Sequence, residues 1–544
     1  MTEFNFDLGL DDTEAFVRQT RSFTLGDQLR KSARMYPDRL AVDDGSTALT
    51  YAELDARSDR LANALRDRGY VPGESTVAVL SENRGETVTL AYACAKLGCL
   101  LATLNWRLER EELVHCADLV TADVLFVSER FTEQADWAVA DGEATPELVG
   151  YDGDGDVAYD ALVDAGAATD PLPDDRVDPE QGFAVLNTSG TTGLPKGVVV
   201  SHRAILSRVV QITIDYGLER GDNYPAWGPM FHPAGVTWIG LTAVHCGTFY
   251  PIDGFAPERI TDVVLDSDRP ISWLFLVPGV VERLADHVEE RGLGPDDFPE
   301  IRTMGALPDM IEPERIKRIT ELFDAPFQNT YGAAEDGHAA SGSKIPVGVA
   351  PDKETLRKHE TSLIDVKFID ERWNDSDAEE AEMAVRGPSL CSGYIRNPEA
   401  NGEDFRDGWF RTGDVFERHG DGTYSFVSRR KYLIKPGGEN VYPAELEEIL
   451  ITHDAVEEVV VVRADDPDWG EVPRAIVGVH DVADPDELRA ELLALVEAEL
   501  ARYKLPHYIK FVDADEFGRS ATGKIVRAEI EEWPIDDDER VREV

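Results

Sequence analysis

Apolar and polar residues follow one another along this chain in blocks that predict alternating strands and helices. The apolar run 77–80 is typical of a buried strand. Before it, residues 54–69 carry apolar side chains at helical spacing, and this predicted amphipathic helix ends at a glycine. After it, residues 86–97 predict a second helix that is also followed by a glycine. Strands that alternate with helices in this order favour a doubly wound α/β layer.

The pattern continues with further strands and one irregular stretch. Short apolar runs predict strands at 183–186, 198–200, 271–277 and 301–304. Pro278 is expected to open a helix at its first turn. Residues 130–180 are acidic, rich in Gly, Ala and Pro, and weakly periodic, so we expect a variable excursion there.

The C-terminal part of the chain alternates as well. Strands are expected at 456–462, 475–479 and 509–512, and a helix at 486–503. These elements predict a small α+β unit of about a hundred residues, within the usual range of domain sizes. The chain of 544 residues is too long for one core, so at least two domains are expected.

Composition adds an extreme acidic charge to this picture. The chain has 106 acidic and 54 basic residues, a formal charge of −52, and 42% of its residues are hydrophobic. Such a charge argues against nucleic acid and anionic membranes as partners, since both repel it. The acidic residues are spread along the chain, which predicts a solvated surface. Our hypothesis is a halophilic protein, because molar salt shortens the Debye length to about 3 Å and screens self-repulsion.

Cysteine usage and the N-terminus indicate a cytoplasmic protein. The five cysteines contain no CxxC pair and are expected as small core residues in a reducing compartment: Cys94, Cys99, Cys116, Cys246 and Cys391. The first residues are acidic and lack the basic and apolar regions of a signal peptide. The most apolar long stretch, 88–104, is interrupted by Lys96 and is too short for a membrane span.

One loop carries the candidate chemistry. It lies between two predicted strands and reads Thr188, Ser189, Gly190, Thr191, Thr192, Gly193, Leu194, Pro195, Lys196 and Gly197. Glycines let backbone N–H groups point inward together, and hydroxyls and a lysine add donors suited to phosphate oxygens. The loop is not a Walker A motif, which requires Gly before and Ser or Thr after the lysine. A mobile surface turn is the alternative that composition alone favours.

This ten-residue loop resembles the phosphate-binding signature of the adenylate-forming superfamily, which contains acyl-CoA synthetases, peptide-synthetase adenylation domains and luciferases. Further resemblances follow in the family's order and cover roughly residues 45–530. They lie at 305–308, 329–335, 382–388, 407–414, 428–431 and 519–527. The resemblance implies an α/β fold with a large N-terminal domain, 1–430, containing doubly wound sheets, and a mobile α+β C-terminal domain, 431–544. A hinge at Lys431 is expected to join the two.

The resemblance also assigns residues to ATP. It implies that Lys524, Thr188 and Glu335 are catalytic, with Glu335 as a ligand of Mg²⁺, a hard cation that prefers oxygen. It implies that Asp414 accepts the ribose hydroxyls and that Arg429 contacts ribose and phosphate. The other residues expected around ATP or AMP are Ser189, Gly190, Thr191, Thr192, Gly193, Lys196, Gly305, Ala306, Asn329, Thr330, Tyr331 and Gly332.

The acid and coenzyme A are assigned in the same way. The resemblance implies an acyl pocket formed by Trp227, His232, Val236, Gly305 and Gly332. Acetyl-specific relatives have Trp at the position of Gly332, so an acid larger than acetate is expected. Gly437 and Gly438 are expected to let the pantetheine arm of coenzyme A pass close to the backbone.

Two residues depart from the family's pattern, and several have plain structural alternatives. Ala334 stands where the family has Thr, which puts turnover rate in doubt, and Ser428 replaces a usual Gly. Taken alone, Lys524 would be a solvated loop charge and His232 a core or surface residue. Residues 305–308 would equally be a plain turn between strand and helix.

Together these motifs predict an ATP-dependent acid–CoA ligase. It would convert a carboxylic acid to acyl-AMP with release of pyrophosphate and then transfer the acyl group to coenzyme A. The substrate stays open among fatty, aryl and small branched acids, with fatty and aryl acids favoured, and the oligomeric state stays open too. Two alternatives remain: an adenylation enzyme that loads a carrier protein, and a nucleotide-binding relative without turnover. His232 speaks against the first, because amino-acid adenylation domains have Asp there.

Overall fold

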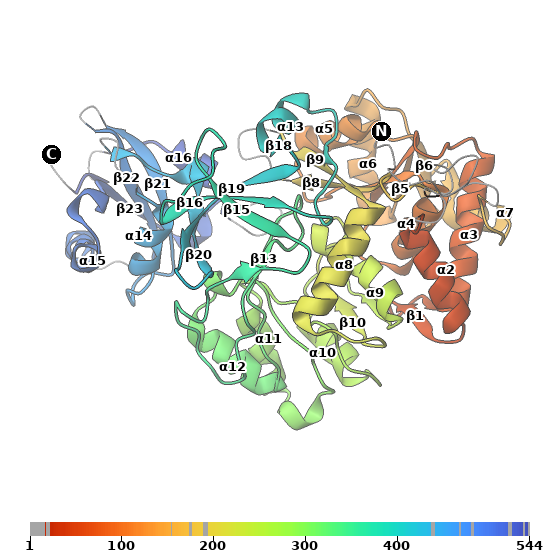
Figure 1. The fold of residues 1–544 in the computed structure, drawn as a ribbon, viewed down its shortest axis with the longest axis horizontal. Coiled ribbons are helices and arrows are strands. Elements are labelled where there is room, and N and C mark those ends of the chain that lie inside the picture. Colours follow the sequence, from red (N-terminus) through yellow and green to blue (C-terminus); the bar gives the residue numbers. More distant parts are fainter. Residues whose placement is uncertain are drawn as a thin grey trace. The chain divides into compact units, whose positions relative to one another are not determined.

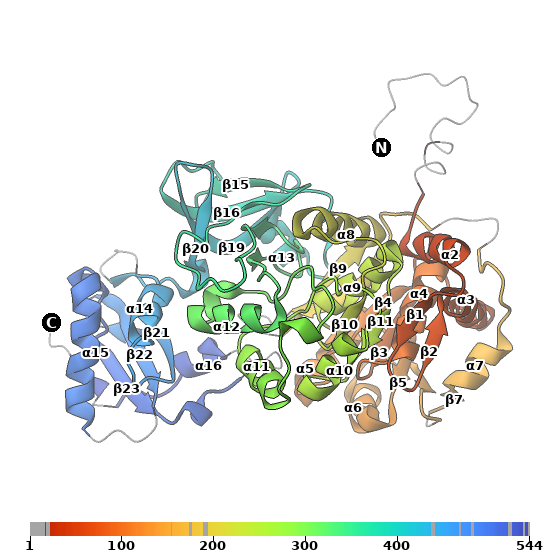
Figure 2. The same ribbon diagram turned by 90° about the horizontal axis from the view of Figure 1, so that it is seen from below.

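We describe a computed structural model of the chain, shown in Figures 1 and 2. The structure describes residues 17, 22–153, 155–172, 177–188, 194–436, 441–466, 469–479, 484–519, 525–536 and 539–541. These residues form two compact units. Unit one contains the described residues of 17–366 and 385–410, and unit two contains those of 367–384 and 411–541.

The largest sheet of unit one has eight strands and confirms the predicted alternation. In sheet order these are β17 (Gly393–Tyr394), β9 (Lys196–Ser201), β8 (Gly182–Thr188), β4 (Leu100–Thr103), β3 (Thr76–Leu80), β5 (Val124–Val127), β6 (Glu147–Gly150) and β7 (Val157–Ala158). The strands from β8 to β7 pair in parallel, whereas β9 is antiparallel to both of its neighbours. The sheet is therefore mixed, because β8 and β9 are joined by a hairpin.

Helices cover both faces of this sheet, which explains the fully apolar strands. Val77 and Val79 of β3 pack into one core with α3 (Tyr51–Asp67) and α4 (Gly85–Leu97). Ala78 and Leu80 pack on the other face. There they meet α5 (Arg110–Val120) and α6 (Thr132–Asp141). The alternation of side chains along a strand thus divides β3 between two cores.

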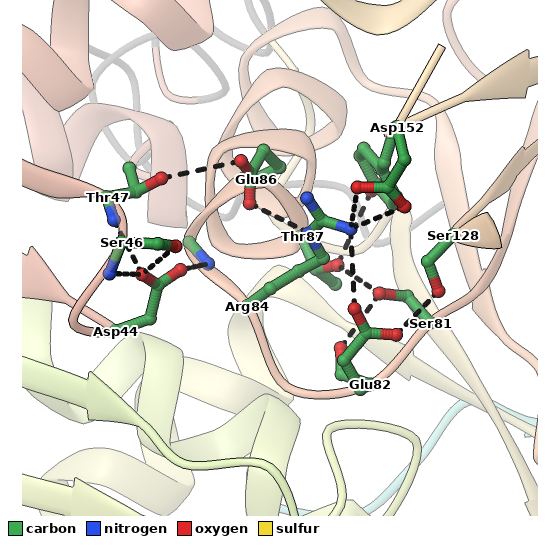
Figure 3. A network of polar contacts seen from close by, with 12 residues as sticks. Asp44, Ser46, Thr47, Ser81, Glu82, Arg84, Glu86, Thr87, Ser128 and Asp152 are labelled. Carbon is green, nitrogen blue, oxygen red and sulfur yellow. Dashed lines mark hydrogen bonds and ion pairs between the residues drawn. The ribbon is translucent and has the colours of Figure 1, made fainter. Parts of the chain in front are cut away.

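The predicted helix 54–69 begins at Tyr51, because Thr50 caps its N-terminus in a capping box with Glu53. The predicted helix 86–97 is α4. At its start, Asp44 accepts a hydrogen bond from the backbone N–H of Gly85 at 2.8 Å. Beside it, Arg84 forms ion pairs with Glu82, Glu86 and Asp152, as Figure 3 shows. This network fixes the turn between β3 and α4.

The expectation of an irregular excursion over 130–180 is wrong in part. The described residues of this range contain helix α6, strands β6 and β7, and helix α7 (Tyr159–Ala165). The two strands extend the parallel sheet at its edge. Their short length and the polar residues between them gave too weak a periodicity to detect.

A second sheet and a helical layer complete unit one. The sheet has the order β10 (Tyr224–Ala226), β11 (Phe249–Pro251), β1 (Leu40–Asp43) and β2 (Ala48–Thr50). The other helices of this unit are α2 (Leu25–Met35), α8 (His202–Tyr216), α9 (Pro233–His245), α10 (Pro257–Leu265), α11 (Val281–Glu290), α12 (Pro313–Phe323) and α13 (Pro398–Asp404). A small sheet has the order β12 (Thr330–Tyr331), β13 (Ala340–Ser341) and β14 (His359–Glu360).

The expected strands 271–277 and 301–304 are present only as isolated bridges. Ile271 bridges Asn223 and Ile301, and Met304 bridges Leu274 and Phe327, all in parallel. The segments follow the course of a sheet but pair too intermittently to be strands. Helix α11 begins at Val281, so Pro278 precedes it by a turn instead of opening it.

Unit two contains most of a sheet of long strands and a separate C-terminal layer. The first includes β15 (Asp365–Ile369), β16 (Glu380–Arg386), β19 (Trp409–Arg418) and β20 (Tyr424–Arg429), and β18 (Phe405–Arg406) pairs with the first residues of β19. The C-terminal layer has strands β21 (Glu458–Asp466), β22 (Gly470–Gly478) and β23 (Tyr508–Val512) with helices α14 (Pro443–Leu450), α15 (Pro485–Glu499) and α16 (Arg527–Glu531). The predicted α+β character of this region is confirmed, with boundaries shifted by a few residues.

All five cysteines are buried and unbridged, as expected for core residues. Among the helices of the described residues, none combines the length and apolar character needed to cross a membrane.

Candidate active site

The candidate phosphate loop is closed by a β-hairpin. Thr188 ends β8 and Lys196 begins β9, and the two residues pair across the strands. This confirms the predicted order of strand, loop and strand. Five of the expected ATP-binding residues lie in the loop, outside the described residues: Ser189, Gly190, Thr191, Thr192 and Gly193. The hairpin places the hydroxyl of Thr188 and the ammonium of Lys196 at the two ends of that loop.

Lys196 is held at the base of the loop by two contacts. Its Nζ lies 3.3 Å from a carboxylate oxygen of Asp404 and 4.5 Å from the ring centroid of Tyr394. Tyr394 comes close because β17 pairs with β9, with Tyr394 opposite Val198. Sequence reasoning missed Tyr394, since it lies in a two-residue strand almost 200 positions after the loop.

Tyr394 also connects this hairpin to the candidate metal ligand. Its hydroxyl donates a hydrogen bond to Oε1 of Glu335 at 3.0 Å. Burial, followed by the negative charge of Glu335, raises the pKa of Tyr394, so the phenol is protonated and acts as the donor. The backbone N–H of Cys391 donates to the carbonyl of Glu335 at 2.8 Å. Glu335 is thus fixed at both its main chain and its carboxylate.

A buried arginine holds the same turn from another side. Arg208 of α8 is 1% exposed. It donates to the carbonyl oxygens of Ser389, Ala334 and Glu335 at 2.9, 2.8 and 3.1 Å. Burial lowers the pKa of Arg208. The guanidinium supplies donors to the carbonyls of Ser389 and Ala334, and a buried carbonyl left without a donor would cost about 1–3 kcal/mol. The signal in the sequence is a charged residue at a position of the helix where the spacing predicts an apolar one, since Arg208 shares the buried face with Ile205 and Ile212.

Gly332 is required by the backbone around it. A Cβ atom at this position would lie 2.0 Å from the carbonyl oxygen of Gly337. The turn is closed by a hydrogen bond from the N–H of Gly337 to the carbonyl of Ala333 at 2.8 Å. Any side chain at Gly332 would therefore displace this turn, whatever the size of the acyl pocket. Ala334 itself is buried, and its carbonyl accepts from Arg208.

Segment 305–308, which contains the expected ATP-binding residues Gly305 and Ala306, is tied to the motif that contains Glu335. Gly305 has a φ of 69°, and a Cβ there would lie 1.9 Å from the ring of Phe327. Only glycine fits this position. Two residues further along, the N–H of Leu307 donates to the hydroxyl of Thr330 at 3.1 Å. The two predicted motifs therefore contact each other, and Ala306 of the first motif is buried.

Asn329 and Tyr331 flank Thr330 with different surroundings. Asn329 is fully buried, and its Nδ2 donates to the carbonyls of Leu356 and Arg357 at 2.9 and 3.2 Å. Tyr331 is half-buried and pairs with Ala340. Asn329 therefore anchors the motif, whereas the exposed part of Tyr331 suits contact with a ligand.

The expected wall of the acyl pocket is aromatic. Trp227 is 8% exposed, and its Nε1 donates to the carbonyl of Phe275 at 2.5 Å. Its ring lies 5.1 Å from that of Phe255. His232 is exposed and caps α9 by accepting from the N–H of Ala234 at 3.4 Å, while Val236 is buried in the same helix.

A buried asparagine that sequence reasoning missed holds this wall. Nδ2 of Asn83 donates to the carbonyls of Ala226, Gly228 and Ile252 at 3.1, 2.8 and 3.0 Å. Its Oδ1 accepts from the N–H of Met230 at 2.8 Å. One side chain after β3 therefore ties down the segment that carries Trp227.

In unit two, the two expected ribose contacts are adjacent. Asp414 and Arg429 pair across β19 and β20, and Nε of Arg429 lies 2.8 Å from Oδ1 of Asp414. The expected hinge residue Lys431 lies two positions after Arg429, within a short 3₁₀ turn. Gly437, Gly438 and Lys524 lie outside the described residues.

The carboxylate of Glu335 fits a magnesium ion bound largely through phosphates. Among the described residues, no three His, Cys, Asp or Glu side chains are grouped to hold a metal. Mg²⁺ keeps several waters and is commonly bound by one or two carboxylates together with substrate phosphates. A single oriented carboxylate beside the phosphate hairpin suits this mode.

Comparisons with known proteins agree with this arrangement. Residues 29–395 match the AMP-binding enzyme family, and residues 445–524 match the AMP-binding enzyme C-terminal domain. The chain belongs to the AMP-binding enzyme family. The expected domain boundary at residues 430 and 431 falls between the two matches and stays a prediction.

Similar members of the AMP-binding enzyme family span nearly the whole chain. Feruloyl-CoA synthase of an Amycolatopsis species is 33% identical over 519 residues, 94% of this chain and 99% of that protein. Indoleacetate–CoA ligase of Aromatoleum aromaticum is 31% identical over 515 residues, 93% and 97%. The structure of a fatty acyl CoA synthetase of Mycobacterium tuberculosis has a TM-score of 0.74 and 27% identity, covering 94% and 98%. The chain is therefore an enzyme of this family.

Lys431 gives this AMP-binding enzyme a measurable pH property. Burial lowers its pKa to about 8, and the nearby charges of Arg429 and Arg527 act in the same direction, whereas Asp414 opposes them. The unfolded value is about 10.4. Between these two values the unfolded chain binds more protons, so the contribution of Lys431 to the free energy of unfolding rises with pH.

We expect the ammonium of Lys431 to titrate near pH 8 in the folded enzyme. Nuclear magnetic resonance of ¹³C-labelled lysine measures this titration, and the signal missing from Lys431→Arg assigns it. In parallel, the free energy of unfolding of the wild type should rise relative to that of Lys431→Met between pH 8 and pH 10. A titration near the ordinary lysine value would contradict the expectation.

Proposed function

We propose that this chain activates an aromatic carboxylic acid with ATP and transfers the acyl group to coenzyme A. The reaction class is that of an AMP-forming acid–CoA ligase. The observation that carries the proposal is the convergence of Lys196, Tyr394 and Glu335 at the base of the phosphate hairpin. The arrangement offers a cation and an oriented carboxylate beside one anion-binding loop, as joining a carboxylate to a triphosphate requires.

The first half-reaction forms a mixed anhydride. A carboxylate oxygen of the acid attacks the α-phosphorus of ATP, and the bond to the β-phosphate oxygen breaks, releasing pyrophosphate. Thr188 and Lys196 would donate to phosphate oxygens, and Lys524 would neutralise charge on the attacking and equatorial oxygens. Glu335 would hold Mg²⁺, which when bound would act as a Lewis acid on the phosphate oxygens. Asp414 and Arg429 would orient the ribose.

The second half-reaction forms the thioester. The thiolate of coenzyme A attacks the carbonyl carbon of acyl-AMP, and the bond between that carbon and the phosphate oxygen breaks, releasing AMP. Gly437 and Gly438 would lie along the pantetheine arm, and rotation at Lys431 would separate the two half-reactions. Lys524 would act in the first step only.

Two features favour an aromatic acid. The similar relatives include enzymes named for feruloyl-CoA and indoleacetate. Of the expected pocket residues, Trp227 lies beside two further aromatic rings, those of Phe255 and Phe275, whose centroids lie 5.1 and 6.0 Å from that of Trp227. Aromatic side chains pair favourably with a further ring. A carrier-protein substrate and a protein without turnover are the alternatives that the assay below separates.

We expect aromatic acids to exceed acetate by at least about 100-fold in kcat/KM, since single methylenes in apolar pockets already change it by about 10–200-fold. The measurement is AMP and pyrophosphate release over a panel of aryl, fatty and short acids, with and without coenzyme A. Fatty acids as the best substrates would contradict the aromatic class. Pyrophosphate release that is unaffected by coenzyme A would favour carrier loading, and no release with any acid would contradict the enzyme.

We expect Lys524→Ala to lower the rate of acyl-AMP formation by roughly 10²–10³-fold, the usual loss of a charge-stabilising donor. Thioester formation from supplied acyl-AMP should change little. Lys317→Ala provides the control, because this surface lysine forms its ion pair along helix α12, with Glu314. An equal loss in both half-reactions would contradict the assignment of Lys524.

We also infer that the acidic surface is adapted to molar salt, as the charge of −52 suggests. The melting temperature should rise by roughly 5 °C or more between dilute and 2 M KCl, about 2 kcal/mol for domains of this size. Sodium and potassium chloride should act alike if screening is the cause. A melting temperature that is flat or falling with salt would refute the adaptation.

A further inference from the structure

Tyr394 contacts both charged groups of the candidate phosphate site. Its hydroxyl donates to Glu335 at 3.0 Å, and the face of its ring lies 4.5 Å from Nζ of Lys196. We propose that Tyr394 is the positioning residue that orients the Glu335 carboxylate for a divalent cation bound with ATP. This proposal rests on the proposed function, because it concerns the metal–nucleotide complex of the same site.

The backbone of Tyr394 is held rigidly, as a positioning residue requires. Asn401 clamps it in both directions: the N–H of Tyr394 donates to Oδ1 of Asn401 at 2.8 Å, and Nδ2 of Asn401 donates to the carbonyl of Tyr394 at 2.8 Å. A Cβ on Gly393 would lie 2.8 Å from the same Oδ1, so glycine lets the clamp approach. Asn401 belongs to α13, so the helix after β17 fixes the strand.

The ring of Tyr394 is confined as well. Phe405 packs on it with ring centroids 5.7 Å apart and planes at 70°. Lys196 lies on the ring and is held there by Asp404 at 3.3 Å. Tyr394 is 5% exposed, so its hydroxyl has little freedom to leave Glu335 for water.

The hydrogen bond from Tyr394 to Oε1 of Glu335 favours one orientation of this carboxylate. An ionised carboxylate has about four lone-pair sites, so a donor on Oε1 leaves capacity for a cation. Residues that orient a metal ligand in this way typically contribute about 10–100-fold to metal affinity or activity. The carbonyl of Glu335 is fixed independently by Cys391 and Arg208, so loss of the hydroxyl would leave the main chain of Glu335 in place.

The test is Tyr394→Phe, which keeps the ring against Lys196 and Phe405 and removes only the hydroxyl. Binding of Mn²⁺ with a non-hydrolysable ATP analogue is measured by electron paramagnetic resonance on the full chain. We expect the Kd to rise roughly tenfold. Tyr92→Phe is the matched control, because it removes another buried hydroxyl, which donates to the carbonyl of Ile239 at 2.7 Å. It should leave the Kd unchanged.

A double-mutant cycle separates positioning from general loosening of the structure. If Tyr394 acts through the carboxylate, Tyr394→Phe should change the Kd less than about twofold in a Glu335→Gln background, because interacting residues are not additive. The same tenfold loss in both backgrounds, or no loss in the wild-type background, would overturn the proposal. A wild-type enzyme that does not bind the metal–nucleotide complex would overturn the proposed function together with it.

Discussion

The position of strand β9 between β8 and β17 is the constraint on which the site depends. Pairing with β8 closes the phosphate loop, and pairing with β17 brings Tyr394 to the base of that loop. Glu335 joins them from a third segment of the chain. An antiparallel register allows no gradual adjustment, because a slip of one residue would turn every side chain to the opposite face. The alternation of Val198, Val199 and Val200 between two cores therefore also fixes where Lys196 lies.

Buried polar side chains fix the loops next to the sheet by hydrogen bonds to their backbone. Asn83 makes four hydrogen bonds to backbone groups around Trp227, and Arg208 makes three around Glu335. Buried backbone groups need partners, and irregular segments cannot provide them through a ladder. A side chain with several donors or acceptors solves this locally. The loops that would bind ligands are thus held by residues that need not touch a ligand.

Sequence reasoning predicted the elements whose signals are local. Periodicity and glycine positions predicted the alternation of strands and helices, the hairpin around the candidate phosphate loop and the α+β character of the C-terminal layer. The motif residues were assigned by resemblance, and their roles stay a prediction, although the structure joins two of the motifs by a hydrogen bond between Leu307 and Thr330. Tyr394, Arg208 and Asn83 were missed, because their importance arises from contacts across long sequence separations. The segments at 271–277 and 301–304 failed as strands because apolar character does not determine how continuously a segment pairs.

The glycine at position 332 has two explanations, one based on the size of the acid and one based on the backbone. By resemblance, a small residue there indicates a pocket that admits an acid larger than acetate. In the structure, the carbonyl of Gly337 already excludes any side chain, so the glycine follows from a close backbone approach alone. A chain with this turn would keep glycine for either a small or a large acid. Under the proposed function, the size of the acid would therefore be set by residues whose identity the backbone does not dictate, and Trp227 is the candidate for this role. The rings of Phe255 and Phe275 pack on that of Trp227, and Nε1 of Trp227 also donates to the carbonyl of Phe275, so ring packing and one hydrogen bond together define this wall of the expected acyl pocket.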